Sequence, residues 1–304
     1  MLSLGLLSLF TLGVATACTP SHLPSPSSSV QLFIDFDGTI VTSDAYTTLA
    51  TAAYATLPSN TTVLPWDEIE TIYEHRASAA AASLPPPSSL ASAIVHADDA
   101  SLRDVEVWSF NWVKDMGLFA TAREAELLKY ARNQTLRPGW CGFAREALRR
   151  GVGIHVVSLN WSPSWVRLVL REAGACADVA AQVRTYAPEI LPAGTLPFAG
   201  ALNHNVSLFS GEDKTVLMEG ILRDVHVERV VFVSDGDADL RPLWGEPTNV
   251  GIVAGFQGSA ARTFREYGVG VWDAGEGWKG FTGEKRNAVY GFEDWGDIAD
   301  LLWS

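Results

Sequence analysis

Short apolar runs alternate with amphipathic stretches along most of the chain. Runs rich in Val, Ile, Leu and Phe are typical of buried strands, and they fall at 30–35, 152–158, 229–234, 250–253 and 269–272. Apolar residues at helical spacing predict helices at 138–151, 163–174, 213–224, 257–267 and 294–303. Strands that are apolar throughout and separated by helices are typical of parallel sheets. The pattern therefore predicts an α/β, Rossmann-like fold with helices on both faces of the sheet.

Residues 44–135, which separate the first two predicted strands, have a different pattern. Apolar side chains recur there at helical spacing, and no convincing strand is present. We therefore expect an all-helical insertion at 44–135 in an α/β core formed by 30–43 and 136–304. Within that core, the segment 178–211 is irregular, with room for short strands and a hairpin near 203–205.

Helix ends can be predicted at two places in the insertion. Ser43 or Asp44 is expected to cap a helix that runs to about Leu57, because small polar side chains accept hydrogen bonds from the first free N–H groups of a helix. Thr121 and Glu124 have the spacing of a capping box and predict the start of a later helix.

Two aspartates, Asp35 and Asp37, directly follow the first apolar run, and Gly38 and Thr39 come next. Like charges so close together raise each other's pKa, and burial raises it further, so the pair is costly unless a cation or a reaction uses it. Gly38 lets the backbone turn sharply, and the Thr39 hydroxyl and new N–H groups follow. This arrangement fits a site that holds Mg²⁺ beside a phosphate, with one carboxylate free to attack phosphorus.

Three more polar groups follow apolar runs or open a helix later in the chain: Ser158-Leu159-Asn160, Asp213-Lys214 and Ser234-Asp235-Gly236-Asp237-Ala238-Asp239. With Asp35-Phe36-Asp37-Gly38-Thr39 they resemble, in order and spacing, the four motifs of the haloacid dehalogenase superfamily of hydrolases. The resemblance covers residues 30 to 239. An all-helical insertion after the first motif is similar to the cap of the phosphoserine-phosphatase-like branch, which closes over the site and selects the leaving group.

The resemblance implies a role for each matching residue. Asp35 would be the nucleophile that forms an aspartyl-phosphate, and Asp37 would be the general acid towards the leaving alcohol and then the base that activates water. Ser158 would donate a hydrogen bond to a phosphoryl oxygen. Lys214 would neutralise phosphate charge and restrain Asp35. The implied activity is that of a phosphatase acting on a small phosphomonoester.

The same resemblance implies Mg²⁺ as the cofactor. The carboxylates of Asp35 and Asp235 and the backbone carbonyl of Asp37 would bind the ion, while Asp239 would support the metal or Lys214. An all-oxygen set suits a hard cation. Supporting positions within the motifs are Gly38, Thr39 and Asn160.

The fourth motif departs from the common pattern of this branch. Ser234 stands where Gly is usual, and Ala238 stands where Asn is usual, although the carboxylates of Asp235 and Asp239 keep their four-residue spacing. Asp237 is an additional acid in the loop and is interpreted as a solvated bystander. The departures leave open a catalytically inactive binding or scaffold protein that retains the fold, and a phosphomutase would use the same residues.

The charge of the chain narrows the class of partner. A net charge of −13 argues against binding to nucleic acid, whose phosphates would be repelled. A small phosphorylated metabolite drawn in by local positive charge is the expected ligand. Thr42, Ser43 and Asp44 follow the first motif so closely that chain continuity places them at the substrate entrance.

Three basic residues of the insertion, Arg76, Arg103 and Lys114, could meet a carboxylate or phosphate of the substrate, or be solvated surface charges. The sequence assigns no oligomeric state.

The first 29 residues do not follow the α/β pattern. Residues 1–17 are apolar and end in Ala15-Thr16-Ala17, which fits a secretory signal peptide, although no Lys or Arg precedes the apolar stretch. Residues 18–29 are rich in Pro and Ser and are expected to be a flexible leader. We expect secretion or passage through the secretory pathway, with no membrane span after cleavage. The alternative is a cytoplasmic protein.

Cysteines and glycosylation sequons bear on the same question. Cys141 and Cys176 could pair if the chain is secreted, or could be buried free thiols. Sequons occur at Asn60, Asn133, Asn205 and Asn160. A glycan on Asn160 would block the second motif, so either the chain avoids a glycosylating compartment or Asn160 is inaccessible there.

Overall fold

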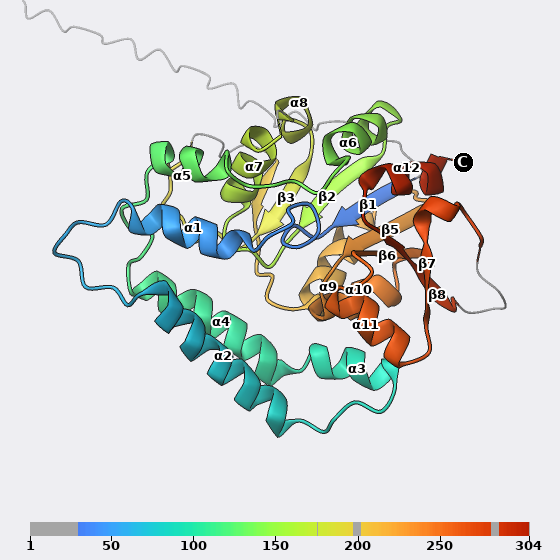
Figure 1. Cartoon of the computed structure of the whole chain (residues 1–304), viewed down its shortest axis with the longest axis horizontal. Helices are drawn as coiled ribbons and strands as arrows, with labels where there is room; N and C mark the ends of the chain where they lie inside the picture. The colour runs from blue at the N-terminus through green and yellow to red at the C-terminus, as the bar shows by residue number, and fades with distance from the viewer. Residues whose placement is uncertain (1–29, 175, 197–201, 281–285, 304) are drawn as a thin grey trace, which may run out of the picture.

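The structure is a computed structural model, and it describes residues 30–174, 176–196, 202–280 and 286–303. The predicted signal peptide and leader lie outside the described residues. An eight-stranded sheet runs through the centre of the molecule with helices on both faces (Figure 1). Every pair of neighbouring strands is parallel. The predicted α/β, Rossmann-like fold is therefore confirmed.

The strands follow the order β4-β3-β2-β1-β5-β6-β8-β7 across the sheet. Their bounds are β1 Val30–Ile34, β2 Gly153–Val157, β3 Arg184–Ala187, β4 Asn203–Asn205, β5 Arg229–Ser234, β6 Val250–Ala254, β7 Gly270–Asp273 and β8 Ala288–Phe292. Strand β1 is central and pairs with β2 on one side and β5 on the other. The strands that precede three of the four motifs are therefore neighbours.

Side chains that alternate along the strands build a separate core on each face of the sheet. Leu32 and Ile34 of β1 belong to one core, and Phe33 belongs to the other. The first core is covered by α1 Ala45–Tyr54, α5 Glu124–Ala131, α6 Trp140–Arg149, α7 Pro163–Glu172, α8 Ala177–Ala180 and α12 Trp295–Trp303. The second is covered by α3 Leu90–Ala97, α9 Gly211–Leu222, α10 Leu240–Trp244 and α11 Ser259–Glu266.

The inserted segment is helical, as its pattern predicts. Its two longest helices, α2 Trp66–Ser83 and α4 Ala100–Asp115, pack together beside the sheet layers (Figure 1). The insertion leaves and rejoins the core at one place, because Val41 and Leu136 form an antiparallel bridge and Thr42 N donates to Thr135 O at 3.0 Å. Within the insertion, α1 and α5 contact each other, and α5 contacts the core helix α7.

Three local predictions are corrected. The capping box of Thr121 and Glu124 is wrong: Arg123 is the N-cap residue of α5 without a side-chain bond, and the Thr121 hydroxyl donates instead to Thr56 O at 3.1 Å. The hairpin near 203–205 is wrong as well, since β4 pairs in parallel with β3. The strand β8 was not predicted. It is buried along its whole length and separates β6 from β7. Its run is short and contains Gly291, and glycine weakens the sequence signal of a strand.

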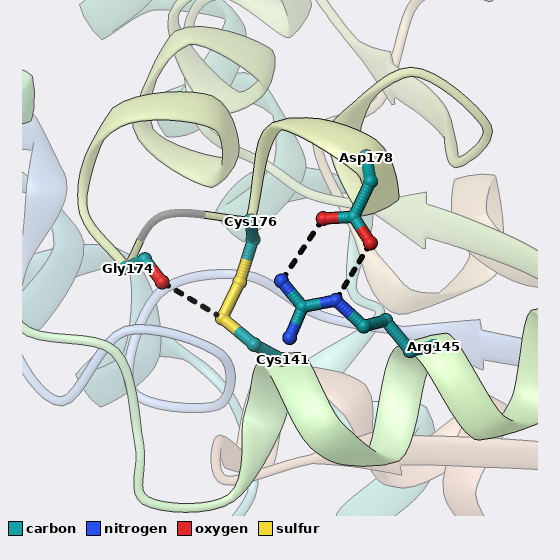
Figure 2. The surroundings of a disulfide bond; sticks show 5 residues. All are labelled: Cys141, Arg145, Gly174, Cys176 and Asp178. Carbon is teal, nitrogen blue, oxygen red and sulfur yellow. Dashed lines mark hydrogen bonds and ion pairs between the residues drawn. A yellow bond between two sulfur atoms is a disulfide. The ribbon is translucent and has the colours of Figure 1, made fainter.

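Cys141 and Cys176 form a disulfide with a Cα–Cα distance of 5.7 Å. Figure 2 shows it between the start of α6 and the start of α8, beside an ion pair of Arg145 and Asp178. Of the two alternatives for these cysteines, the disulfide is therefore the one found. In the part of the chain that the structure describes, no helix has both the length and the apolar composition needed to cross a membrane.

Candidate active site

The carboxyl ends of β1, β2 and β5 bring the predicted motifs together at one edge of the sheet. Asp35 and Asp37 follow β1, Ser158 follows β2, and Asp235 follows β5. The backbone ties β1 to β5 here, because Asp35 N donates to Val233 O at 2.8 Å. In open α/β sheets this edge is where ligands bind.

Lys214 is the electrostatic centre of the site. Its Nζ donates to Asp35 Oδ1 at 2.8 Å and to Asp239 Oδ2 at 2.7 Å, and its side chain is 1% exposed. Burial lowers the pKa of Lys214, but the charges and hydrogen bonds of Asp239 and Asp35 outweigh it and raise the pKa above its ordinary value. Lys214 is therefore a permanent cation that fixes the orientation of Asp35.

The surroundings of Asp35 disfavour the ionised form of its carboxyl group. Burial raises its pKa well above the ordinary value, the Lys214 charge lowers it, and the nearby carboxylates of Asp239 and Asp235 raise it again. A second positive charge beside Asp35 and Asp235 would offset this penalty and favour the ionised carboxylate.

Asp37 has the properties of a proton donor and acceptor at neutral pH. Its Oδ2 accepts from Asn160 Nδ2 at 3.0 Å, and its Oδ1 accepts from Ala45 N at 2.7 Å. Burial raises the pKa of Asp37 to about 7 in spite of these two bonds, which lower it. A group with this pKa can give a proton in one step and take one in the next.

Asp235 lies directly against the turn that follows Asp35. Thr39 Oγ1 accepts from Asp235 N at 3.0 Å and donates to Asp235 Oδ1 at 3.3 Å. Gly38 has a φ of +69°, and a Cβ atom there would lie 2.3 Å from Asp235 Oδ2. Glycine at 38 is thus required both by the backbone angle and by the carboxylate beside it.

The residues present fit a hard divalent cation. The carboxylates of Asp35 and Asp235, with the main-chain oxygen of Asp37, form an all-oxygen donor set, and the Gly38 turn leaves room for the Asp235 carboxylate. Among the described residues, no three His, Cys, Asp or Glu side chains are arranged to hold a metal ion together.

The remaining motif residues support these groups. Ser158 is 1% exposed, and its Oγ accepts from Asn160 N at 3.0 Å. Ser234, at the position where the sequence departs from the usual pattern, donates from Oγ to Asp239 Oδ2 at 2.7 Å. This hydroxyl adds a bond to the Lys214 network that a glycine could not supply. Asp237 is exposed, as expected of a solvated residue.

Arg137 is a functional residue that the sequence did not reveal. Its Nε donates to Thr39 O at 3.0 Å, and a second guanidinium nitrogen donates to Gly38 O. Arg137 thus binds two carbonyls of the turn that follows Asp35, although it lies 98 residues beyond Thr39 in the chain. No motif could have identified it, because its contact depends on where the insertion rejoins the core.

A cavity of about 340 Å³ opens from these residues towards the inserted helices. One side, which we call the core wall, is lined by Asp35, Asp37, Ser158, Leu159, Asn160, Trp161, Lys214, Ser234, Gly236, Ala238 and Asp239. The other side, the cap wall, is lined by Asp44, Tyr46, Trp66, Ile69, Glu70, Tyr73, Glu106 and Ser109. A volume of this size suits a small metabolite.

Of the three residues predicted at the substrate entrance, one lines the cavity and two do not. Asp44 lines the cavity and caps α1 by accepting from Tyr46 N at 2.7 Å. Thr42 and Ser43 are exposed, and their hydroxyls donate to Thr135 O and Gln134 Oε1, each at 3.4 Å. Neither of them is among the residues that line the cavity.

The chain was compared with known protein families, curated proteins and solved structures. No family model and no curated protein matches the chain. Among solved structures, a phospho-aspartyl intermediate analogue of phosphoserine phosphatase is 16% identical, with a TM-score of 0.48 over 88% of this chain and 96% of that one. The motifs of the chain resemble those of the haloacid dehalogenase superfamily.

Two further superfamily-like structures are similar to it. A phosphoserine phosphohydrolase-like protein from Francisella tularensis subsp. tularensis SCHU S4 is 11% identical, with a TM-score of 0.46 over 90% of this chain and 99% of that one. A putative phosphoglycolate phosphatase from Lactobacillus delbrueckii subsp. bulgaricus is 12% identical, with a TM-score of 0.42 over 88% and 96%.

Proposed function

We propose that the chain is a Mg²⁺-dependent phosphatase that hydrolyses a small phosphomonoester through an aspartyl-phosphate. The observation that carries this proposal is the contact of Lys214 Nζ with both Asp35 and Asp239, in the cavity that Asp37 also lines. A buried lysine between two carboxylates, next to a carboxyl group with a pKa near 7, supplies a nucleophile, a proton carrier and charge neutralisation in one place.

The reaction has two balanced half-reactions. Asp35 attacks phosphorus with a carboxylate oxygen, the bond from phosphorus to the ester oxygen breaks, and Asp37 gives its proton to the departing alkoxide. Asp37, now ionised, takes a proton from a water molecule that attacks the aspartyl-phosphate, which releases inorganic phosphate and regenerates Asp35. Ser158 is placed to donate to a phosphoryl oxygen. Mg²⁺ at Asp35, Asp235 and the Asp37 carbonyl would neutralise phosphate charge when bound.

The test is a panel of phosphomonoesters given to the purified protein with Mg²⁺ and with EDTA, alongside Asp35→Asn. We expect metal-dependent release of phosphate that is lost in the variant, because Asn fits the same volume but cannot attack phosphorus. No release from any ester would favour an inactive binding or scaffold protein. Activity retained in EDTA would contradict the metal assignment. Transfer of the phosphoryl group to another hydroxyl, without free phosphate, would identify a mutase.

We also propose that the chain enters the secretory pathway. The disulfide of Cys141 and Cys176 supports an oxidising compartment. Asn60, Asn133 and Asn205 are exposed, whereas Asn160 is fully buried and would escape glycosylation once folded. When the protein is expressed in a secreting eukaryotic cell, we expect glycans on the three exposed sequons and none on Asn160. Digestion with a glycosidase, followed by mapping of the modified asparagines, measures this. A glycan-free protein that remains in the cytosol would contradict the proposal.

A further inference from the structure

The cap wall of the cavity is acidic and aromatic. Glu70 and Glu106 project from α2 and α4, and Asp44 lies at the start of α1. Three aromatic side chains, Tyr46, Trp66 and Tyr73, line the same wall. Carboxylates and the faces of aromatic rings both attract cations.

Among the described residues that line this wall, none is basic. The cation that lines the cavity is Lys214, which is bound to Asp35 and Asp239 on the core wall. Two of the three basic residues of the insertion that could have met a substrate anion are engaged elsewhere. Arg103 pairs with Asp213 at 3.0 Å, and the Arg76 guanidinium lies 3.9 Å from the ring centre of Trp108. A carboxylate on the leaving group would therefore be buried among like charges without a partner.

Several acceptors in the cavity have capacity for a donor from the ligand. Glu70 accepts from Trp66 Nε1 at 2.7 Å and from Thr47 Oγ1 at 3.0 Å, both at Oε1, and Glu106 accepts from Tyr73 at Oε1. Within the part of the chain that the structure describes, neither Oε2 accepts a hydrogen bond, so each can accept one from the ligand. Burial raises the pKa of Glu106 above its ordinary value, so its charge is poorly solvated and would be stabilised by a cation.

Asn160, fully buried on the core wall of the cavity, is a second and independent indication that the ligand carries a hydrogen-bond donor. Its Nδ2 donates to Asp37, and its Oδ1 has no hydrogen-bond partner among the described residues. A phosphate dianion offers only acceptors and cannot satisfy this oxygen, whereas an N–H group can.

We propose that the leaving group of the substrate carries an organic ammonium group, which the cap wall binds through Glu70, Glu106 and the aromatic rings. This inference rests on the proposed phosphatase function. The phosphoryl group lies on the core wall beside Lys214 and Asp35, and the alcohol extends towards α2 and α4. The substrate class is the phosphate monoester of an amino alcohol without a carboxylate.

The experiment compares esters that differ only in charge. O-Phosphoethanolamine is paired with n-propyl phosphate, and phosphocholine with 3,3-dimethylbutyl phosphate, while phosphoglycolate supplies an anionic leaving group. We expect kcat/KM for at least one ammonium ester to exceed that of its neutral partner by about tenfold or more, and phosphoglycolate to be the poorest. Glu106→Gln should lower the ammonium-to-neutral ratio about tenfold, because Gln keeps the shape and removes the charge.

Glu74→Gln is the matched control, since Glu74 is an exposed residue of α2 outside the cavity lining, and it should leave the ratio unchanged. The ratio is measured within each variant, so any general loss of catalysis cancels. Metal-dependent hydrolysis with equal rates for charged and neutral partners, or a preference for phosphoglycolate, would overturn the inference and leave the phosphatase function intact. Failure to hydrolyse any ester, neutral ones included, would overturn the phosphatase function instead.

Discussion

The two walls of the cavity are stabilised in different ways. On the core wall, side chains from distant segments bind one another: Lys214 joins the end of β1 to the loop after β5, and Asn160 joins the end of β2 to Asp37. On the cap wall, the bonds of Glu70 and Glu106 stay within the inserted segment. A substitution on the core wall therefore disturbs the edge of the sheet. A substitution on the cap wall disturbs only the inserted segment.

The difference separates chemistry from specificity. The groups proposed to react with phosphorus are held by buried, charge-assisted hydrogen bonds. The groups proposed to bind the leaving alcohol are half-buried, on helices that pack beside the sheet layers (Figure 1). Substitutions on the core wall should consequently change turnover or stability, whereas substitutions on the cap wall should mainly change KM.

Asp35→Asn should have the largest effect on activity. We expect turnover to fall about a thousandfold or more, because no other carboxylate is placed to replace the nucleophile. The free energy of unfolding should change little, since Asn fits the space and burial already disfavours the Asp35 charge. Phosphate release and urea denaturation measure the two quantities. An active Asp35→Asn protein would mean that the core wall does not hold the nucleophile.

Lys214→Met should have the largest effect on stability. It leaves Asp35 and Asp239 buried as neighbouring acids without their shared cation, which costs about 3–5 kcal/mol. Denaturant unfolding measures the loss. Lys279→Met is the control, because Lys279 pairs with Glu276 on the surface, where both side chains are largely exposed. That substitution should have little effect. Equal losses in the two variants would show that the buried network does not stabilise the core wall.

Gly38→Ala should disturb the geometry of the core wall. Both Gly38 (φ +69°) and Gly151 (φ +78°) have left-handed backbones, so alanine at either position costs about 1 kcal/mol. A Cβ at 38 also meets Asp235, whereas one at 151 meets nothing within 4 Å. Gly38→Ala should therefore lower activity and raise the Mg²⁺ concentration needed for half-maximal rate. Gly151→Ala should lose stability alone, and a similar loss of activity in both variants would contradict the assignment of Asp235.

Trp66→Phe should have the smallest effect, because it changes only the cap wall. The variant loses the Nε1 bonds to Glu70 at 2.7 Å and Thr47 at 3.1 Å, which contribute about 1 kcal/mol to stability. We expect KM to rise a few-fold and kcat to change less, as measured by steady-state kinetics with the best ester of the panel. A fall in kcat as large as that of Gly38→Ala would mean that the two walls are not separable.

Much of the fold could be predicted from the sequence. The apolar runs at β1, β2 and β5 marked the centre of the sheet, because strands buried on both faces must be apolar throughout. The edge was harder to predict. Strand β8 is a short run with a glycine, and its place between β6 and β7 depends on pairing partners that come earlier in the chain. Strand β4 has only three residues, and its parallel pairing with β3 is not set by a local turn.

What the sequence alone determined about this protein is which polar side chains gather at the carboxyl edge of the sheet. Asp35, Asp37, Lys214 and Asp235 follow strands or open a helix, and parallel strands bring such positions to one edge of the sheet. The tertiary structure decided the rest. The Thr121 hydroxyl bonds to another partner, and Arg137 contacts the turn that follows Asp35. Cys141 pairs with Cys176. Glu70, Glu106 and the aromatic rings line one cavity. The reason is physical: each motif residue lies next to a strand end or helix start in its own segment, whereas the cap wall depends on how separate helices pack.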